Sequence, residues 1–144
     1  MKIKFKKLND KAVIPKYATP GSAGMDLVSV VEKKIWTDDY SVIDTGLSIE
    51  IPEGYEAQVR SRSGLAVKFG LAVLNSPGTI DSDYRGEIKV ILYNHGPHTY
   101  EVKAGERIAQ LVIAPVIQPE IEVTEDLSDT ERGAGGFGST GVSA

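Results

Sequence analysis

The chain has 144 residues, of which 41% are hydrophobic and 25% are charged, and it contains no cysteine. This length and composition suit one globular domain and argue against wholesale disorder. The formal net charge of −4 argues against a protein that grips a nucleic-acid backbone, although a local basic cluster can hold a small anion. Without cysteine there are no disulfides and no thiolate chemistry. The N-terminal residues lack the apolar segment of a signal peptide, and no run approaches a membrane span, so a cytoplasmic location is expected.

Short apolar runs joined by turns that contain glycine and proline predict an all-β domain. Several runs alternate apolar and polar residues, which is the period of a half-buried strand. Helical periodicity over ten or more residues occurs nowhere, and only residues 63–68 suggest a short helical turn. Strands are expected near 2–6, 27–31, 40–44, 47–51, 55–60, 71–74, 88–93, 100–102, 107–114 and 121–123.

Two loops place polar residues beside predicted strands. Asp26 follows the glycine-containing loop 18–24 and stands at the entrance of a buried strand, where an acid can also simply cap a turn. Ser63 is expected to cap the short helical turn, which would place free backbone N–H groups beside Arg62. A helix N-terminus next to a guanidinium suits an anion, but an ordinary N-cap beside a surface arginine has the same sequence.

Residues 78–87 are expected to form the bend of a β-hairpin between the strands at 71–74 and 88–93. This bend concentrates two carboxylates, a phenol and a guanidinium within residues 81–85. It is therefore either a solvated acidic turn or a loop that presents chemistry from a rigid scaffold. Calcium binding is excluded, because Arg85 and Leu92 occupy positions where an EF-hand loop needs oxygen ligands.

Isolated polar side chains elsewhere admit two interpretations each. Gln110 is a lone amide in an apolar run, and it either serves the core or faces a ligand. His95 and His98 share one turn with no other nearby ligand, which favours solvated side chains over a metal site.

The C-terminal tail differs in composition from the rest of the chain. Half of residues 132–141 are glycine and only Phe137 is apolar, so the segment should be mobile when free. Arg132, Ser139, Thr140 and the glycine N–H groups can all donate hydrogen bonds to phosphate. The segment is not a P-loop, because the Gly-Lys-Ser/Thr ending and the strand–helix context are missing.

Taken together, these segments resemble the trimeric deoxyuridine triphosphate nucleotidohydrolases, the dUTPases, over about residues 12–141. The family's motifs occur in order, with no departure at a functional position. They are Ala23-Gly24-Met25-Asp26-Leu27, Arg62-Ser63-Gly64-Leu65-Ala66, Gly78-Thr79-Ile80-Asp81-Ser82-Asp83-Tyr84-Arg85-Gly86, Gly105-Glu106-Arg107-Ile108-Ala109-Gln110-Leu111 and Arg132-Gly133-Ala134-Gly135-Gly136-Phe137-Gly138-Ser139-Thr140-Gly141.

The resemblance implies a homotrimer of jelly-roll-like β subunits, each a β-barrel or sandwich over residues 1–131. The tail at 132–144 of one subunit would close over an active site formed by the other two. The implied reaction is hydrolysis of dUTP to dUMP and pyrophosphate with Mg²⁺. Such a site needs a base for the attacking water, charge neutralisation and a grip on the phosphates.

The resemblance also assigns roles to individual residues. Asp81 matches the family's base, and Asp26 matches the acid that holds the hydrated Mg²⁺ through water. The residues matching phosphate-binding positions are Arg62, Ser63, Gly64, Gln110, Arg132, Ser139 and Thr140. The residues matching base- and sugar-binding positions are Asn75, Thr79, Ile80, Tyr84, Lys89 and Phe137. Tyr84 would lie under the deoxyribose, Phe137 would stack on the uracil, and Asp83 and Arg85 would fix the loop.

Two rival functions differ in the chemistry they require. A dCTP deaminase would need a general acid or base at C4 of the pyrimidine, which none of these motifs supplies. A non-catalytic or additionally regulatory nucleotide-binding trimer would act through its tail, but the presence of Asp81, Asp26 and Gln110 favours catalysis. The expected partners are therefore dUTP and further copies of this chain, with no nucleic acid and no membrane.

Overall fold

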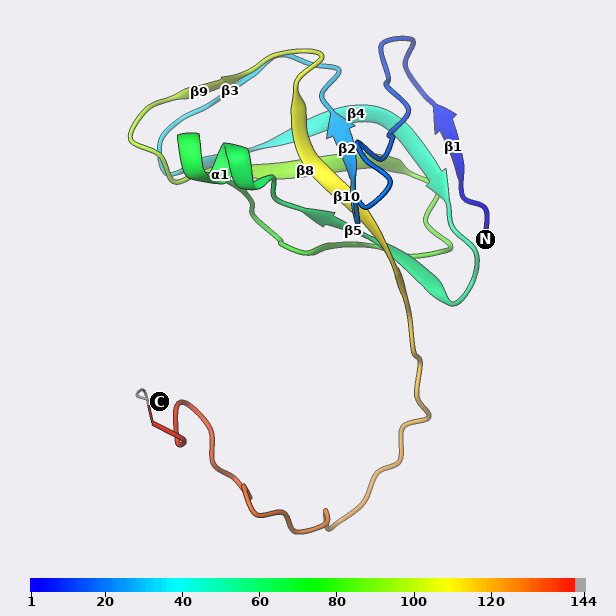
Figure 1. The fold of residues 1–144 in the computed structure, drawn as a ribbon, viewed down its shortest axis with the longest axis vertical. Coiled ribbons are helices and arrows are strands. Elements are labelled where there is room, and N and C mark those ends of the chain that lie inside the picture. The colour runs from blue at the N-terminus through cyan, green and yellow to red at the C-terminus, as the bar shows by residue number, and fades with distance from the viewer. Residues whose placement is uncertain (142–144) are drawn as a thin grey trace.

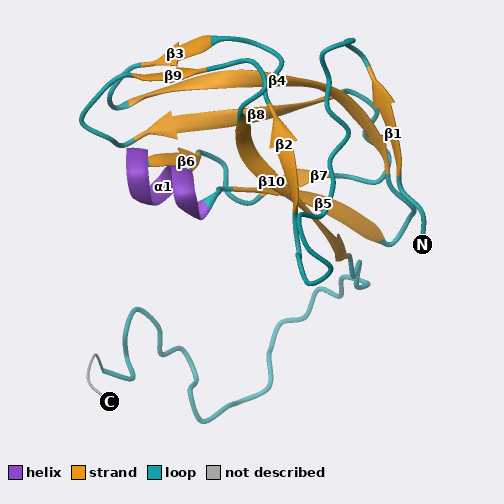
Figure 2. Cartoon of the chain, turned by 45° about the horizontal axis from the view of Figure 1, so that its top comes forward, coloured by secondary structure: helices purple, strands orange, loops and turns teal. Residues whose placement is uncertain are grey.

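The computed structural model describes residues 1–141, and its main body consists of two four-stranded sheets (Figures 1 and 2). The first sheet has the order β1 (Lys4–Lys7), β4 (Asp39–Glu50), β8 (Glu87–Asn94) and β6 (Leu71–Val73). The second has the order β2 (Met25–Val28), β10 (Arg107–Pro115), β5 (Tyr55–Arg60) and β7 (Gly78–Ile80). A small third sheet pairs β3 (Lys33–Ile35) with β9 (Tyr100–Val102), and helix α1 spans Ser63–Phe69.

The all-β prediction is confirmed, as is the short helical turn. Neighbouring strands in every described sheet are antiparallel. The two large sheets form a jelly-roll-like sandwich, and neither closes into a barrel within residues 1–141. Within the same residues, no helix has the length and apolar content needed to cross a membrane.

The core lies between the two sheets and follows from strand periodicity. Along β8, Ile88, Val90 and Leu92 are buried while the residues between them face outward. In the second sheet, Val59 and Leu111 point inward in the same way. Each such side chain contributes about 1.5–3 kcal/mol when removed from water. The alternation leaves the other face of each sheet free for polar groups.

Strand β4 is one continuous element where two separate strands were expected. The register of β4 against β8 shifts between Asp44 and Ser48, and Gly46 sits in that irregularity with φ +66°. A side chain at Gly46 would lie 2.8 Å from the Asn9 Cβ atom, so this position requires glycine. The glycine marks a bulge inside a strand and not a turn between two strands.

The segment 78–87 is more than a hairpin bend. Strands β6 and β8 do pair antiparallel, with Leu71 opposite Asn94, as the flanking apolar runs predicted. Between them, however, Gly78–Ile80 form β7, which pairs with β5 in the other sheet. The chain therefore crosses from the first sheet to the second and back. This crossing places the loop after β7 at the edge of the second sheet.

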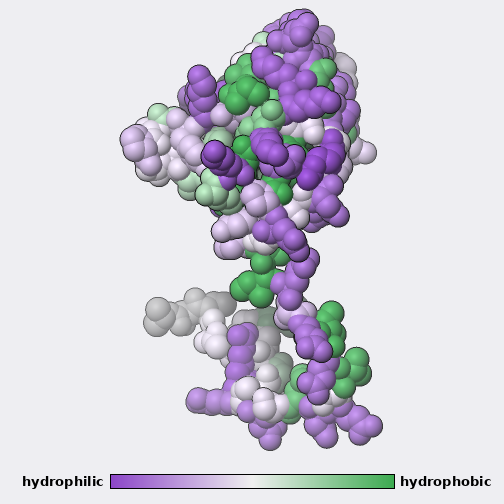
Figure 3. All heavy atoms as spheres, turned by 90° about the vertical axis from the view of Figure 1, so that its right-hand side faces the viewer, coloured by the Kyte–Doolittle hydropathy of each residue, from purple (hydrophilic) through white to green (hydrophobic). Residues whose placement is uncertain are grey.

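After Pro115 the chain leaves the body as an extended arm, residues 116–131, followed by the tail (Figures 1 and 3). The strand expected at 121–123 is not formed, and that expectation was wrong for this chain in isolation. Ile121 and Val123 are 88% and 94% exposed, and the described contacts of the arm with the body are at its start, where the Val116 N–H donates to the Gly54 carbonyl at 2.9 Å. Their alternation remains suited to burial against another surface.

Asn94 offers a test of how the fold fixes the turn 94–98. Its buried Nδ2 donates to the carbonyl oxygens of Ile35 and His98 at 3.0 and 2.8 Å, and its Oδ1 accepts from the Gly96 N–H at 2.9 Å. Asn94→Ala should lower the free energy of unfolding by about 3 kcal/mol, because buried backbone groups lose their partners. Urea unfolding at fixed protein concentration measures this. The exposed neighbour is the control: His95→Ala should change stability by less than about 1 kcal/mol. Equal effects of the two variants would contradict the role of Asn94.

Candidate active site

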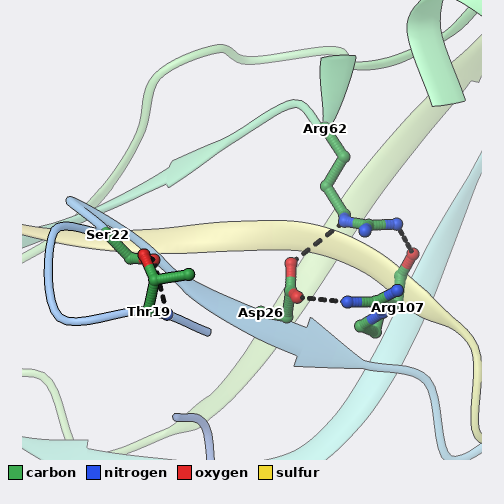
Figure 4. A network of polar contacts seen from close by, with 5 residues as sticks. All are labelled: Thr19, Ser22, Asp26, Arg62 and Arg107. Carbon is green, nitrogen blue, oxygen red and sulfur yellow. Dashed lines mark hydrogen bonds and ion pairs between the residues drawn. The ribbon is translucent and has the colours of Figure 1, made fainter. Parts of the chain in front are cut away.

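Asp26 lies between two guanidinium groups beside the outer face of the second sheet (Figure 4). Its Oδ1 accepts a hydrogen bond from Arg62 Nε and its Oδ2 accepts one from Arg107 Nη1, both at 3.0 Å. Arg62 also donates from Nη1 to the Arg107 carbonyl oxygen at 3.0 Å. The side chains of Arg62 and Asp26 are only 24% and 25% exposed, so water screens this ion pair less than a surface pair.

Gln110 joins the same group, which is called the arginine cluster below (Asp26, Arg62, Arg107 and Gln110). It pairs with Asp26 in the register of β10 against β2, and its Nε2 donates to the Ser61 carbonyl oxygen at 3.0 Å. The side chain passes over Gly24, where any Cβ atom would lie 2.7 Å from Gln110 Oε1. Gln110 is thus on the outer face, and its amide does not serve the core.

Helix α1 begins beside this cluster, but not as expected. Arg62 is the N-cap, with φ −91° and ψ 124°, and no side chain caps the helix. Ser63 is the first helical residue, so its predicted capping role was wrong. The first N–H groups of a helix have no partner within it, and the carbonyl oxygen of Arg62 already accepts from Leu65 and Ala66. The exposed Ser63 and Gly64 therefore present their N–H groups at the N-terminus, as the sequence suggested.

Arg107 is the member of the cluster that was not expected from the sequence. Strict alternation along β10 would put Arg107 and Gln110 on opposite faces, because they are three residues apart. The register against β2 slips between Arg107 and Ala109, and both Ile108 and Ala109 are buried. This β-bulge reverses the alternation and turns Arg107 outward beside Asp26.

The loop after β7 and the segments that flank it carry a second set of expected site residues, called the hairpin cluster below (Asn75, Thr79, Ile80, Asp81, Tyr84 and Lys89). A groove of about 1000 Å³ opens beside it. The groove is lined by Thr79, Asp81 and Ser82 from this loop, by Tyr55 and Glu56 from β5, and by Val116 and Ile117 from the start of the arm. Asp81 is exposed and follows directly after β7, whereas Ile80 points into the core.

The loop is held in shape by its own residues and by Ser48 of β4. Arg85 Nη1 donates to the carbonyl oxygens of Ser82 and Tyr84 at 2.6 and 2.9 Å, and Ser48 Oγ donates to the Arg85 carbonyl at 2.7 Å. The Tyr84 ring lies over Gly86, where a Cβ atom would overlap the phenol, and its hydroxyl donates to the Glu87 carbonyl at 3.1 Å. These contacts fit the structural role expected for Arg85.

Two further residues of the hairpin cluster have defined surroundings. The Asn75 amide covers Gly78, whose Cβ position would be 3.2 Å from Asn75 Nδ2. Lys89 Nζ lies 2.8 Å from Asp44 Oδ1 and 3.5 Å from Glu87 Oε2. Its hydrogen bond with Asp44 raises the pKa of the Lys89 amine. The Lys89 side chain therefore contacts these carboxylates, and the role expected for Lys89 in the pocket wall is that of its backbone.

The tail residues Arg132, Phe137, Ser139 and Thr140 are all exposed and lie away from both clusters (Figure 1). The hydrogen bonds described for residues 132–141 are local, such as Arg132 Nε donating to the Gly135 carbonyl at 2.8 Å. The chain thus brings Asp26, Arg62, Ser63, Gly64 and Gln110 together. Of the hairpin cluster, it places only Thr79 and Asp81 on the same groove. It does not join the tail to either cluster.

The register of the second sheet also fixes how far apart the two clusters lie. Gln110 stands opposite Asp26, while Ile80 stands opposite Ala57, which places Asp81 near the row of Glu56 and Ala114. Ala114 lies four residues after Gln110 along β10, and β7 lies three strand positions away from β2 in the sheet. With about 3.4 Å per residue and about 4.8 Å between strands, Asp26 and Asp81 are roughly 20 Å apart. Both lie on the same, outer side of the sheet.

Comparisons with known proteins agree with these motifs. A sequence profile of the dUTPase family matches residues 10–141. A deoxyuridine 5'-triphosphate nucleotidohydrolase of Nautilia profundicola is 62% identical over 98% of this chain and 99% of its own length. One of Crocosphaera subtropica is 56% identical over 99% of this chain and 100% of its own length.

Solved structures agree as well. The Staphylococcus bacteriophage 80alpha dUTPase with dUpNHpp superposes with a TM-score of 0.91 at 31% identity, covering 98% of this chain and 99% of that one. A mutant dUTPase from phage phi11 of S. aureus, described as revealing the coordination of a structural Mg(II) ion, has a TM-score of 0.83 at 25% identity and covers 90% of this chain and 100% of that one. The chain belongs to the dUTPase family, the enzymes that hydrolyse dUTP to dUMP and pyrophosphate.

Proposed function

We propose that dUTP is hydrolysed at sites shared between neighbouring copies of this chain in a homotrimer. The arginine cluster of one copy would hold the phosphates, and the hairpin cluster of the next would supply the base that activates water. The observation that carries this proposal is the separation of roughly 20 Å between Asp26 and Asp81 within one chain. A base must lie about 3 Å from the water that attacks, so one copy cannot complete its own site.

The placement of both clusters on one face of the second sheet supports the same arrangement. A polar ladder runs between them on β5, where Gln58 accepts from Arg60 at 2.5 Å and donates to Glu56 at 2.7 Å. A head-to-tail contact that sets the arginine cluster of one copy against the hairpin cluster of the next closes into a ring when the rotation between copies returns to the first copy. The number three comes from the family resemblance.

The arm and tail add support from exposed apolar surface. Ile117, Ile121, Val123 and Leu127 are each at least 88% exposed, and Phe137 is fully exposed. Several large apolar side chains exposed along one segment suit burial against another chain. An arm that packs on a neighbouring copy would carry the tail to a site formed by the other two. There Arg132, Ser139 and Thr140 would bind the γ-phosphate and Phe137 would stack on the uracil.

The chemistry assigned to each group follows from its surroundings. Asp81 is exposed at the groove and would orient and deprotonate the water that attacks the α-phosphorus. The Arg62 guanidinium, the N–H groups of Ser63 and Gly64, and Gln110 would bind the α- and β-phosphates. These groups are fixed before substrate arrives, by the contacts of Arg62 with Asp26 and of Gln110 with Ser61.

Recognition of the nucleoside falls to the hairpin cluster in this proposal. Backbone groups of Thr79, Ile80 and Lys89 would pair with the uracil edge, with Asn75 in the wall that excludes a 5-methyl group. Tyr84, folded over Gly86, would lie under the deoxyribose and leave no space for a 2′-hydroxyl. Unmet hydrogen bonds reject an analogue more strongly than the exclusion of one methyl group.

Mg²⁺ fits the arginine cluster only as part of a nucleotide complex. Within residues 1–141 no group of three or more His, Cys, Asp or Glu side chains could cage a metal ion. Asp26 is a single carboxylate, which suits a cation that keeps its waters and binds mainly to the triphosphate. When bound, Mg²⁺ supplies charge neutralisation on the polyphosphate. Asp26 would hold the hydrated ion through water.

Asp81→Asn tests the assignment of the base. It should lower kcat by about 10²–10⁴-fold while the affinity for dUpNHpp stays within about threefold, since the amide keeps the shape but cannot take the proton. Pyrophosphate release and calorimetric titration measure the two quantities. Asp83→Asn, in the same loop, is the matched control and should retain most of kcat. Unchanged kcat in Asp81→Asn would remove Asp81 as the base.

Mixing two inactive variants tests whether the sites are shared between copies. Arg62→Gln disables the arginine cluster and Asp81→Asn disables the hairpin cluster, so each homotrimer should be nearly inactive. Co-expressed at equal amounts, the two chains should recover about a quarter of wild-type activity, because one in four interfaces joins two intact clusters. Light scattering should give three times the 15.5 kDa of the chain. No recovery in proven mixed trimers would place both clusters of a site in one copy.

Removal of residues 132–144 tests the tail. The truncated chain should keep its oligomeric mass and its melting temperature, because the described core ends upstream of the tail. Turnover of dUTP should fall by about 10²-fold or more, since the groups proposed for the γ-phosphate and uracil are lost. Phe137→Ala, which leaves the phosphate donors in place, should have a smaller effect. If the truncated chain fails to fold, the tail is structural and the proposed lid is wrong.

A further inference from the structure

Arg107 completes the contacts of Asp26 without being one of the residues proposed to bind phosphate. Asp26 Oδ1 is engaged by Arg62 and Asp26 Oδ2 by Arg107, each at 3.0 Å (Figure 4). Arg62 in turn donates to the Arg107 carbonyl oxygen. Two of the nitrogens of Arg62, Nε and Nη1, are therefore fixed through Asp26 and Arg107. One Nη1 hydrogen and both Nη2 hydrogens of the guanidinium remain to meet an anion.

The position of Arg107 depends on several dedicated features. The bulge at Ile108 turns it outward, at the cost of one irregular step in an otherwise regular strand. The turn before it is anchored by Glu106, which accepts from the Lys103 N–H at 3.0 Å and from the Tyr100 hydroxyl. With 58% of its side chain exposed, Arg107 contributes little to the core. Its placement is better explained by what it does to Asp26.

The charge of the cluster determines which ions it accepts. Two guanidinium groups and one carboxylate leave one net positive charge around Asp26. A free divalent cation approaching Asp26 is repelled by both arginines, whereas a polyphosphate is attracted. A cation carried by a polyphosphate arrives with an excess of negative charge, so it meets no such barrier. Each carboxylate oxygen can still accept a hydrogen bond from a metal-bound water while it holds its arginine.

We propose that Arg107 is a positioning residue that holds Asp26, and through it Arg62, in the geometry that receives the phosphates. Its charge also makes capture of a divalent cation at Asp26 conditional on the nucleotide. This inference rests on the proposed phosphate-binding role of Arg62 and the proposed metal-holding role of Asp26. Conditional capture explains how a single carboxylate between two arginines can hold a metal ion.

Calorimetric titration with dUpNHpp, in Mg²⁺ and in EDTA, tests the proposal on the full-length chain. Arg107→Gln should weaken binding about tenfold in EDTA but only about threefold in Mg²⁺, because the metal-free nucleotide carries more negative charge. Its KM for dUTP should rise while kcat stays within about threefold. Arg107→Lys keeps the charge and needs to replace a single contact, so its affinities should stay within about threefold of wild type. Arg107→Met provides a second neutral variant if Arg107→Gln does not fold.

Lys68→Gln is the matched control, because it removes one positive charge from exposed helix α1 without touching Asp26. It should change neither affinity by more than about twofold. Paramagnetic resonance with Mn²⁺ gives a separate measurement: the wild-type chain should retain the ion only when dUpNHpp is present.

Three results would overturn the proposal. They are equal losses of affinity in Mg²⁺ and EDTA for Arg107→Gln, equal losses in Arg107→Lys and Arg107→Gln, or micromolar retention of Mn²⁺ by the wild-type chain without nucleotide. Failure of the wild-type chain to bind dUpNHpp in either medium would instead refute the phosphate-binding role itself.

Discussion

The register of β10 between β2 and β5 is the constraint on which the rest of the site depends. Both edges of this strand are hydrogen-bonded, so its register fixes β2, β10 and β5 relative to one another. Gln110 stands opposite Asp26 because of that register, and the bulge at Ile108 brings Arg107 to the same side. A slip of one residue would exchange the polar and apolar faces of the strand. The buried Leu111 and Ala109 oppose such a slip, so core packing also protects the geometry of the arginine cluster.

The same register separates the two clusters that are proposed to share the hydrolysis of dUTP. The groups proposed to bind phosphate gather where β2 and β10 begin to pair, whereas the proposed base lies at the far edge, after β7. Each cluster is well ordered by local contacts, such as those of Arg62 with Asp26 and of Arg85 with Ser82. Neither contains the full chemistry. Assembly would therefore be a condition of catalysis, and dissociation would inactivate the enzyme without unfolding any strand.

The arm and tail obey a different balance of forces from the body. Ile117, Ile121, Val123 and Leu127 are each at least 88% exposed, and the glycine-rich tail gains little by ordering alone. Both segments can be ordered when another copy and a nucleotide supply the missing contacts. A lid that orders only on substrate binding loses some affinity to conformational entropy, but it opens readily to release products.

The positions of most strands and of the main polar loop could be predicted from the sequence alone. The period-two runs located most strands, and the turn residues Asp81, Tyr84 and Arg85 located the loop proposed to carry chemistry, because these signals are local. Where local signals mislead, tertiary contacts decided. Thr45-Gly46 resembles a turn but is a bulge within β4, the apolar alternation at 121–123 has no strand to pair with in its own chain, and the helix is capped at Arg62 and not by Ser63.

The role of Arg107 was hidden for the same reason: simple alternation puts it on the buried side, and only the pairing of β10 with β2 reveals the bulge that turns it toward Asp26. The sequence specifies the residue types, but strand register decides which of them are in contact, and register is set by contacts between distant segments.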